Sequence, residues 1–135
     1  IEIIKFLLAH PKIDVNKWGH NKESAPLLNA LCSACYTRQI ERIEIIKLLL
    51  AHPKIDVNCT TGMVDLPWYH CGAATPLHVT VAFWQAEIAE LLLSHPKIDV
   101  SKKFENWWTA FQWASEKWNT EIVNFIKAHP TFKWE

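Results

Sequence analysis

The sequence predicts an all-α fold made of a repeated helical unit, from an internal repeat and from the spacing of apolar residues within it. Residues 1–16 return almost letter for letter as residues 43–58, and again with a few changes as residues 86–101. A weaker fourth copy occupies residues 120–135. The His-Pro pairs of the last two copies are 34 residues apart, whereas the earlier intervals are 42 and 43 residues. We therefore take 34 residues as the unit and expect insertions in the first two intervals.

The segment shared by all copies is expected to form the longer of two helices. In the second copy, Glu44 and Lys47 alone interrupt a run of Ile and Leu, which is typical of a helix with a wide buried face. The helix should end at His52 and Pro53, because proline has no N–H to donate and disfavours the helical conformation of the residue before it. The Ile-Asp-Val-Asn sequence that follows is expected to run extended into a loop.

A shorter helix is expected upstream of each long one. Thr75 can cap its free N–H groups, and Pro76 has the backbone angle of a first helical residue. Thr109 and Gln112 have the spacing of a capping box, in which each side chain bonds the backbone of the other residue. The equivalent cap in the preceding copy is Ala25, so we expect that helix to be less stable by about 1 kcal/mol.

This order of a short capped helix, a tight turn, a longer apolar helix and an extended return resembles the ankyrin repeat, most closely between Thr75 and Val100. The resemblance covers nearly the whole chain. It implies a solenoid of antiparallel helix pairs, with hairpin-like loops, here called fingers, that project from one side. The resemblance further implies one ankyrin-repeat domain over residues 1–135. Residues 1–16 are a partial repeat with the second helix only, and residues 17–58 are a repeat with a long insertion between its helices. Residues 59–101 are a repeat with a long finger, and residues 102–135 are the C-terminal repeat.

The turn between the two helices departs from the ankyrin pattern. The family usually has glycine there, because the turn needs a positive φ, but this chain has Trp84 and Trp118. A bulky residue is costly in that conformation. The sequence leaves two alternatives open: the turn is remodelled, or burial of the indole compensates.

The resemblance implies a binding module without catalytic activity, which holds a partner protein on its fingers and on the concave, outward side of its short helices. The competing interpretation is a structural spacer within a longer ankyrin array, with the partner site elsewhere. The predicted partner-binding residues are Trp18, Lys22, Ser24, Trp68, Tyr69, Ala82, Phe83, Glu105, Asn106, Trp108, Glu116 and Lys117. Phe83 and Trp108 are the expected anchors, because large aromatic side chains dominate many interfaces.

Each of the eight tryptophans has to be weighed as a core residue before it is assigned to an interface. Trp113 has helical spacing to other apolar residues of its short helix, so we expect it to be buried. For the aromatic residues of the fingers, which include Trp18, Trp68 and Trp108, interface and local packing are equally open.

Residues that carry chemistry in other proteins are assigned structural roles here. Cys32 and Cys35 form a C-x-x-C without the second pair of a structural zinc site, and Cys59, His70 and Cys71 lack a clear fourth ligand. The helix dipole accounts for four histidines that recur at one position, the end of the long helix. These are His10, His52, His95 and His129. We predict no enzyme, no bound metal and no cofactor.

Composition narrows the range of partners. Lys plus Arg and Asp plus Glu both number 14, so the formal charge is zero and nothing indicates nucleic acid or anionic lipid as a partner. The apolar runs are too short to span a membrane. Four cysteines favour a reducing compartment, so we expect a cytoplasmic protein. We also expect a monomer, with self-association as the alternative. The first residues do not read as a secretory signal, and we expect a fragment boundary at Ile1.

Overall fold

The computed structural model describes residues 2–17, 26–27, 30–31, 40–60, 64–66, 69–71, 74–104 and 108–133, and these are predominantly helical. The helices are α1 (Glu2–Leu8), α3 (Ile40–Ala51), α4 (Pro76–Ala82), α5 (Ala86–Leu93), α6 (Ala110–Glu116) and α7 (Thr120–Lys127). The strands of this part of the chain form two antiparallel hairpins, β1 (Val64–Leu66) with β2 (Tyr69–Cys71) and β3 (Lys103–Phe104) with β4 (Trp108–Thr109). The predicted helical class is confirmed, and the short strands lie in the loops before α4 and α6.

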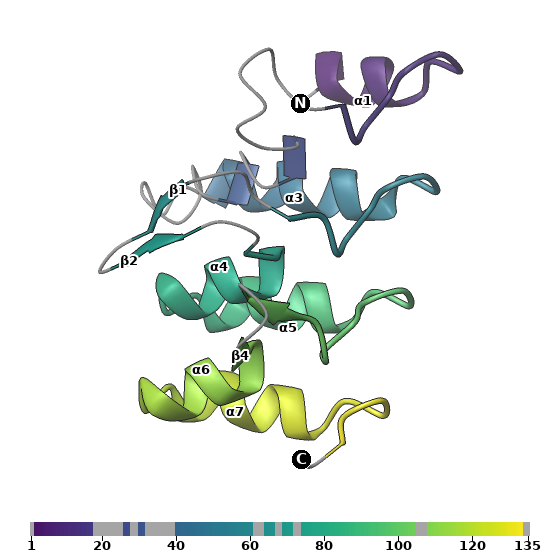
Figure 1. Cartoon of the computed structure of the whole chain (residues 1–135). Coiled ribbons are helices and arrows are strands. Elements are labelled where there is room, and N and C mark those ends of the chain that lie inside the picture. Colours follow the sequence, from purple (N-terminus) through teal and green to yellow (C-terminus); the bar gives the residue numbers. More distant parts are fainter. Residues whose placement is uncertain are drawn as a thin grey trace.

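The helices form layers that follow one another along the molecule, with the two ends of the chain at opposite ends (Figure 1). The helices α1, α3, α5 and α7, which contain the repeated apolar segment, lie one above the next, and each contacts its neighbour. The short helices α4 and α6 pack on α5 and α7, and also on each other. After each of these helices the chain turns back in an extended segment, here called a return. The returns are residues 10–16, 52–58, 95–101 and 129–133, and they lie along one edge (Figure 1).

The core lies between these layers and uses the same positions in successive ones. Ile88 and Leu92 of α5 are almost completely buried, and so are Ile122 and Ile126 at the equivalent positions of α7. Trp113 of α6 is only 9% exposed and belongs to the same apolar cluster. The prediction that Trp113 is a core residue is confirmed.

The starts of the short helices follow the sequence prediction. Thr75 is the N-cap of α4, its hydroxyl accepts the backbone N–H of His78, and Pro76 is the first helical residue. Thr109 and Gln112 form the predicted capping box of α6, with distances of 3.2 Å to Thr109 Oγ1 and 3.0 Å to Gln112 Oε1. Both helices therefore begin where the sequence places them, because a polar side chain replaces the missing intrahelical acceptors.

The ends of the short helices follow neither of the two alternatives that the sequence left open for Trp84 and Trp118, and both are wrong. Both residues have a positive φ, 57° and 58°. Neither is compensated by deep burial, because the indole of Trp84 is 56% exposed and that of Trp118 is 85% exposed. The turn is thus the one that glycine usually makes, with tryptophan in its place, at a cost of about 1–2 kcal/mol for each residue.

Every return begins with a histidine whose ring caps the turn. In all four copies the Nδ1 atom accepts the backbone N–H of the residue two positions later, at 3.1 or 3.2 Å. Each ring therefore supplies an acceptor to the turn that follows its helix, a local contact that the sequence analysis did not include. Burial and the nearby Lys97 lower the pKa of His95.

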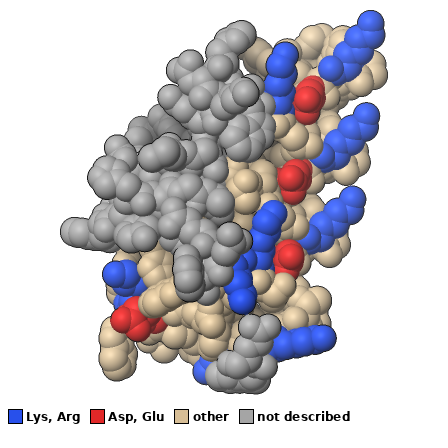
Figure 2. Space-filling view, in the orientation of Figure 1, with Lys and Arg blue, Asp and Glu red and all other residues tan. Residues whose placement is uncertain are grey.

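Hydrogen bonds also join each return to the next one. The Asn58 Nδ2 atom donates to the carbonyl of Lys97 at 2.8 Å, and its Oδ1 atom accepts the N–H of Asp99 at 2.8 Å. Asn16 makes the same two bonds to residues 54–56. Figure 2 shows the charged side chains of this edge in regularly spaced rows. The polar contacts along the returns thus repeat from layer to layer, as the apolar contacts of the helices do.

Candidate binding site

The predicted partner-binding residues divide into two groups. Trp18, Lys22, Ser24, Trp68, Glu105 and Asn106 lie outside the described residues, and Tyr69 belongs to β2, where only the backbone is described. The remaining five are Ala82, Phe83, Trp108, Glu116 and Lys117. Three of these, Trp108, Glu116 and Lys117, are exposed and lie on β4, at the end of α6 and directly after it.

Trp108 occupies the first position of β4, where the strand leads into the N-cap of α6. Its backbone is fixed on one side by pairing with Phe104. On the other side, its carbonyl accepts a hydrogen bond from His78 Nε2 at 3.0 Å, which ties the strand to α4 of the preceding layer. The side chain itself is 40% exposed. The predicted anchor is therefore a partly exposed indole on a backbone that is held in place.

His78 is buried and neutral, which explains how it can hold this strand. Because Nε2 donates to the Trp108 carbonyl, Nδ1 is the acceptor, and the Thr75 hydroxyl donates to it at 2.7 Å. Burial lowers the pKa of His78 to about 4, although the hydrogen bond to Trp108 opposes the shift. The ring also lies 6.3 Å from that of Trp113. His78 thus joins two layers and stays uncharged at neutral pH.

A shallow hollow of about 420 Å³ lies between β4 and the outward side of α6. It is lined by Trp108, Phe111, Gln112, Ser115 and Glu116. The four helical residues are spaced by one, three and one positions, so they share one face of α6. The structure therefore joins two predicted residues, Trp108 and Glu116, into one site.

Three residues of the hollow were missed by the sequence analysis, namely Phe111, Gln112 and Ser115. Their spacing could have identified them, because residues three and four positions apart share a helix face and these three lie on the face of α6 that carries Glu116. Phe111 is half-buried and packs against Phe132, with ring centroids 4.7 Å apart. This pair also lines a second hollow of about 700 Å³ between α6 and the last two returns.

The remaining two predicted residues are at the end of α4. Phe83 is the C-cap of α4 and is half-buried against the core. Ala82 is only 5% exposed, so the expectation that it lies on the outward side of the helix is wrong. The reason is that α4 lies between α5 and α6, and all seven of its residues are buried. Of the two expected anchors, Trp108 is thus the more accessible.

The titratable groups of the described residues include one buried thiol. Burial, with a smaller contribution from Asp56, raises the pKa of the Cys59 thiol to about 12. A thiol with this pKa is protonated at neutral pH and is a poor nucleophile or metal ligand. No group of three or more His, Cys, Asp or Glu side chains is placed to hold a metal ion in the part of the chain that the structure describes. Cys32, Cys35 and the side chains of His70 and Cys71 lie outside that part.

Comparison with protein-family models finds no match, and no curated protein matches the chain. Among the described residues, no helix has both the length and the apolar character needed to cross a membrane. Function is therefore inferred from the internal repeat and from the geometry around Trp108.

Proposed function

We propose that the chain is an ankyrin-repeat solenoid without catalytic activity, which binds a partner protein through its fingers and short helices. The repeat assignment is supported by the 34-residue interval and by the equivalent core positions of α5 and α7. It is also supported by the hydrogen bonds that Asn16 and Asn58 make between successive returns. Such a stack presents a continuous surface on which side chains of several layers can meet one partner.

The observation that carries the binding proposal is the hollow beside Trp108. Its size, about 420 Å³, suits one or two apolar side chains of a partner. Trp108 and Phe111 provide apolar walls, whereas Gln112, Ser115 and Glu116 provide a polar rim. An apolar centre with a polar rim is the usual composition of a protein interface. The partner is therefore expected to insert an apolar or aromatic residue that is flanked by polar ones.

The site is also pre-organised, which favours binding. The strand that carries Trp108 is fixed by Phe104 and by the buried ring of His78. The opposite wall is a helix whose start is fixed by a complete capping box. Little conformational freedom is then lost when a partner binds, and less of the interaction energy is spent on ordering the site.

We also propose a cytoplasmic location and a non-enzymatic role in that compartment. Cysteines are few in the chain, and Cys59 is a free, buried thiol. Free thiols persist where glutathione and thioredoxin keep proteins reduced.

Affinity capture from cell lysate tests the binding proposal. The immobilised wild-type chain is compared with Trp108→Ala, Phe83→Ala and a control, Phe6→Ala, which removes a 77% exposed aromatic from α1. Circular dichroism verifies that each variant is folded. We expect a specific protein to be retained by the wild type and the control, and its affinity to fall about 30-fold with Trp108→Ala. Unchanged retention by a folded Trp108→Ala variant would refute the site, and no specific retention by any form would favour the spacer interpretation.

A further inference from the structure

The turns between the paired helices carry a feature that binding at the hollow does not use. Trp84 and Trp118 follow α4 and α6 at the same position of successive layers, and both project largely into solvent. Gln85 N–H bonds the carbonyl of Thr80 at 2.9 Å, and Trp84 N–H bonds that of Val81 at 3.2 Å. The turn after α6 has the same two bonds. This is the helix ending in which glycine is favoured at the position that tryptophan occupies here.

The two tryptophans are therefore not explained by the fold. Glycine would satisfy the positive φ without strain, and the indoles contribute little to the core, since one is 56% and the other 85% exposed. Strained residues persist mainly where they serve a function. The same strained and exposed residue in two successive layers points to a ligand that contacts both indoles.

The distance between successive layers indicates which kind of ligand could contact both tryptophans. Helices that pack side by side are about 8–10 Å apart, and α4 contacts α6 while α5 contacts α7. A polyproline II helix advances about 9 Å in every turn of three residues. A proline-rich segment that runs along the stack would thus place the same face of successive turns on successive indoles. We propose that Trp84 and Trp118 bind such a segment, at a site separate from the hollow beside Trp108.

The charges near the two indoles indicate which proline-rich sequence fits best. Glu87 and Glu121 follow the tryptophans by three residues, each in the first turn of the next helix, and both are exposed. This acidic position recurs in both layers, whereas the exposed Lys117, directly before Trp118, has the half-buried Phe83 as its equivalent before Trp84. A basic residue of the ligand can pair with these carboxylates, and arginine can also stack on an indole. Single-stranded nucleic acid fits less well, because its phosphates would lie beside the same two carboxylates.

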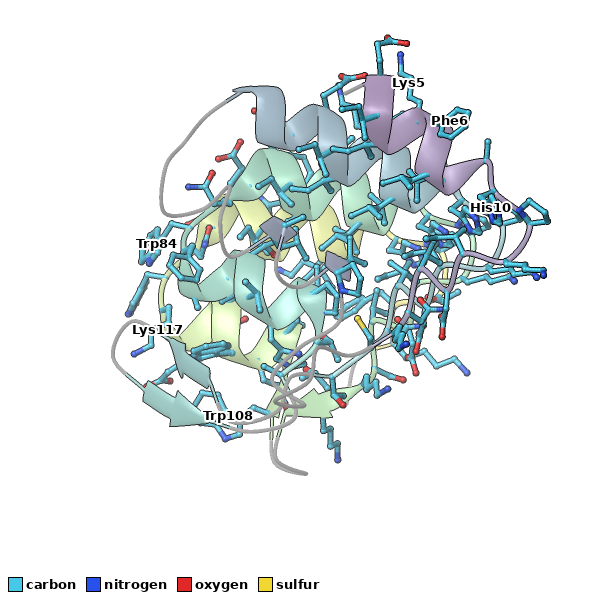
Figure 3. All side chains as sticks on the ribbon, turned by 90° about the horizontal axis from the view of Figure 1, so that it is seen from above. Lys5, Phe6, His10, Trp84, Trp108 and Lys117 are labelled. Carbon is cyan, nitrogen blue, oxygen red and sulfur yellow. The ribbon has the colours of Figure 1, made fainter. Side chains whose placement is uncertain are left out.

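This edge is distinct from the edge formed by the returns. Figure 3, seen along the stack, shows Trp84 and Lys117 at one side and His10 of the first return at the opposite side. Trp108 lies apart from Trp84, on the strand side of the molecule (Figure 3). The two sites can therefore be tested by separate substitutions.

Calorimetric titration with a synthetic peptide tests the proposal. The peptide has about twelve residues, with arginine at every third position and proline elsewhere, and it spans roughly 37 Å as a polyproline II helix. A control peptide keeps the arginines and replaces every proline by glycine or serine. We expect the proline peptide to bind the wild type at least tenfold more tightly than the control peptide, and Trp108→Ala to leave its affinity unchanged.

The decisive variant is Trp118→Gly, because it removes the ligand contact and the strain together. We expect its affinity for the proline peptide to fall at least tenfold while its Tm rises by about 3 °C. Trp118→Ala keeps the strained backbone, so it should lose the same affinity without the rise in Tm. Wild-type affinity in Trp118→Gly, or equal binding of the two peptides, would overturn the proposal. A Tm that falls in Trp118→Gly would show instead that the indole is retained for stability.

Discussion

Removal of the Asn58 side chain should loosen the contact between two layers by a measurable amount. Its amide makes two hydrogen bonds of 2.8 Å to the next return, one to the Lys97 carbonyl and one from the Asp99 N–H. Each bond contributes about 0.5–1.5 kcal/mol to stability. The groups left behind can reach water, because Asn58 is only half-buried. We therefore expect Asn58→Ala to lower the free energy of unfolding by about 2 kcal/mol.

Urea denaturation, followed by circular dichroism at neutral pH, measures this loss. A loss of about 2 kcal/mol corresponds to a midpoint lower by about 1 M urea. Asn16→Ala removes the equivalent pair of bonds and should cost about the same. The control is Ser101→Ala, because among the described residues the Ser101 hydroxyl bonds only Asp99, within its own return, and the change should alter stability by less than about 0.5 kcal/mol. Equal midpoints for Asn58→Ala and Ser101→Ala would refute the argument that these amides join the layers.

Two further predictions concern the same contacts. Ser101→Asn places an amide where Asn16 and Asn58 have theirs, so it should raise the free energy of unfolding by about 1 kcal/mol in the same urea assay, and a loss of stability would show that the last return differs in geometry. His78 has a pKa of about 4 when folded and an ordinary value of 6.5 when unfolded, so the unfolded chain binds more protons between these values. The neutral His78 therefore makes its full contribution to the free energy of unfolding above pH 6.5. This contribution, about 3 kcal/mol, is lost as the pH falls from 6.5 through 4. Urea titrations between pH 7 and pH 4 should therefore show a steeper loss of stability for the wild type than for His78→Phe, and parallel curves would contradict a buried, neutral His78.

Features that depend on a local pattern could be predicted from the sequence. The long helices follow from the repeated apolar segments, and the starts of α4 and α6 follow from Thr75 and from the pair Thr109 and Gln112. Trp113 was also placed correctly in the core, because its helical spacing to other apolar residues decides its side of the helix. In each case the relevant interactions are made by residues close to one another in the chain.

Features that depend on the neighbouring layer were not predictable in the same way. Ala82 looked like an outward residue, but α4 is covered by both α5 and α6. The histidines of the returns were assigned to the helix dipole from their position at helix ends, and only the structure shows that their Nδ1 atoms accept hydrogen bonds from the turn. The hollow beside Trp108 likewise depends on how close β4 lies to α6, which no spacing along the chain determines.

Asn16 and Asn58 occupy the same position of the repeat and make equivalent bonds to the next return. Both amides stand at the end of identical Ile-Asp-Val-Asn segments, so the sequence shows that they are equivalent. Their partners are 38–41 residues away, which is about one repeat interval. A polar residue that recurs at one repeat position is thus a reasonable candidate for a bond between layers.

Site-specific photo-crosslinking tests the central claim, a partner held at the hollow beside Trp108, most directly. A photoreactive phenylalanine analogue is placed at position 108 and, in a control variant, at Lys47, an exposed residue of α3. Both chains are irradiated in cell lysate, and the adducts are identified by mass spectrometry. We predict one specific protein adduct at position 108 that is absent at position 47 and that unlabelled wild-type chain suppresses. The same adducts at both positions, or none at position 108, would contradict a partner site at the hollow.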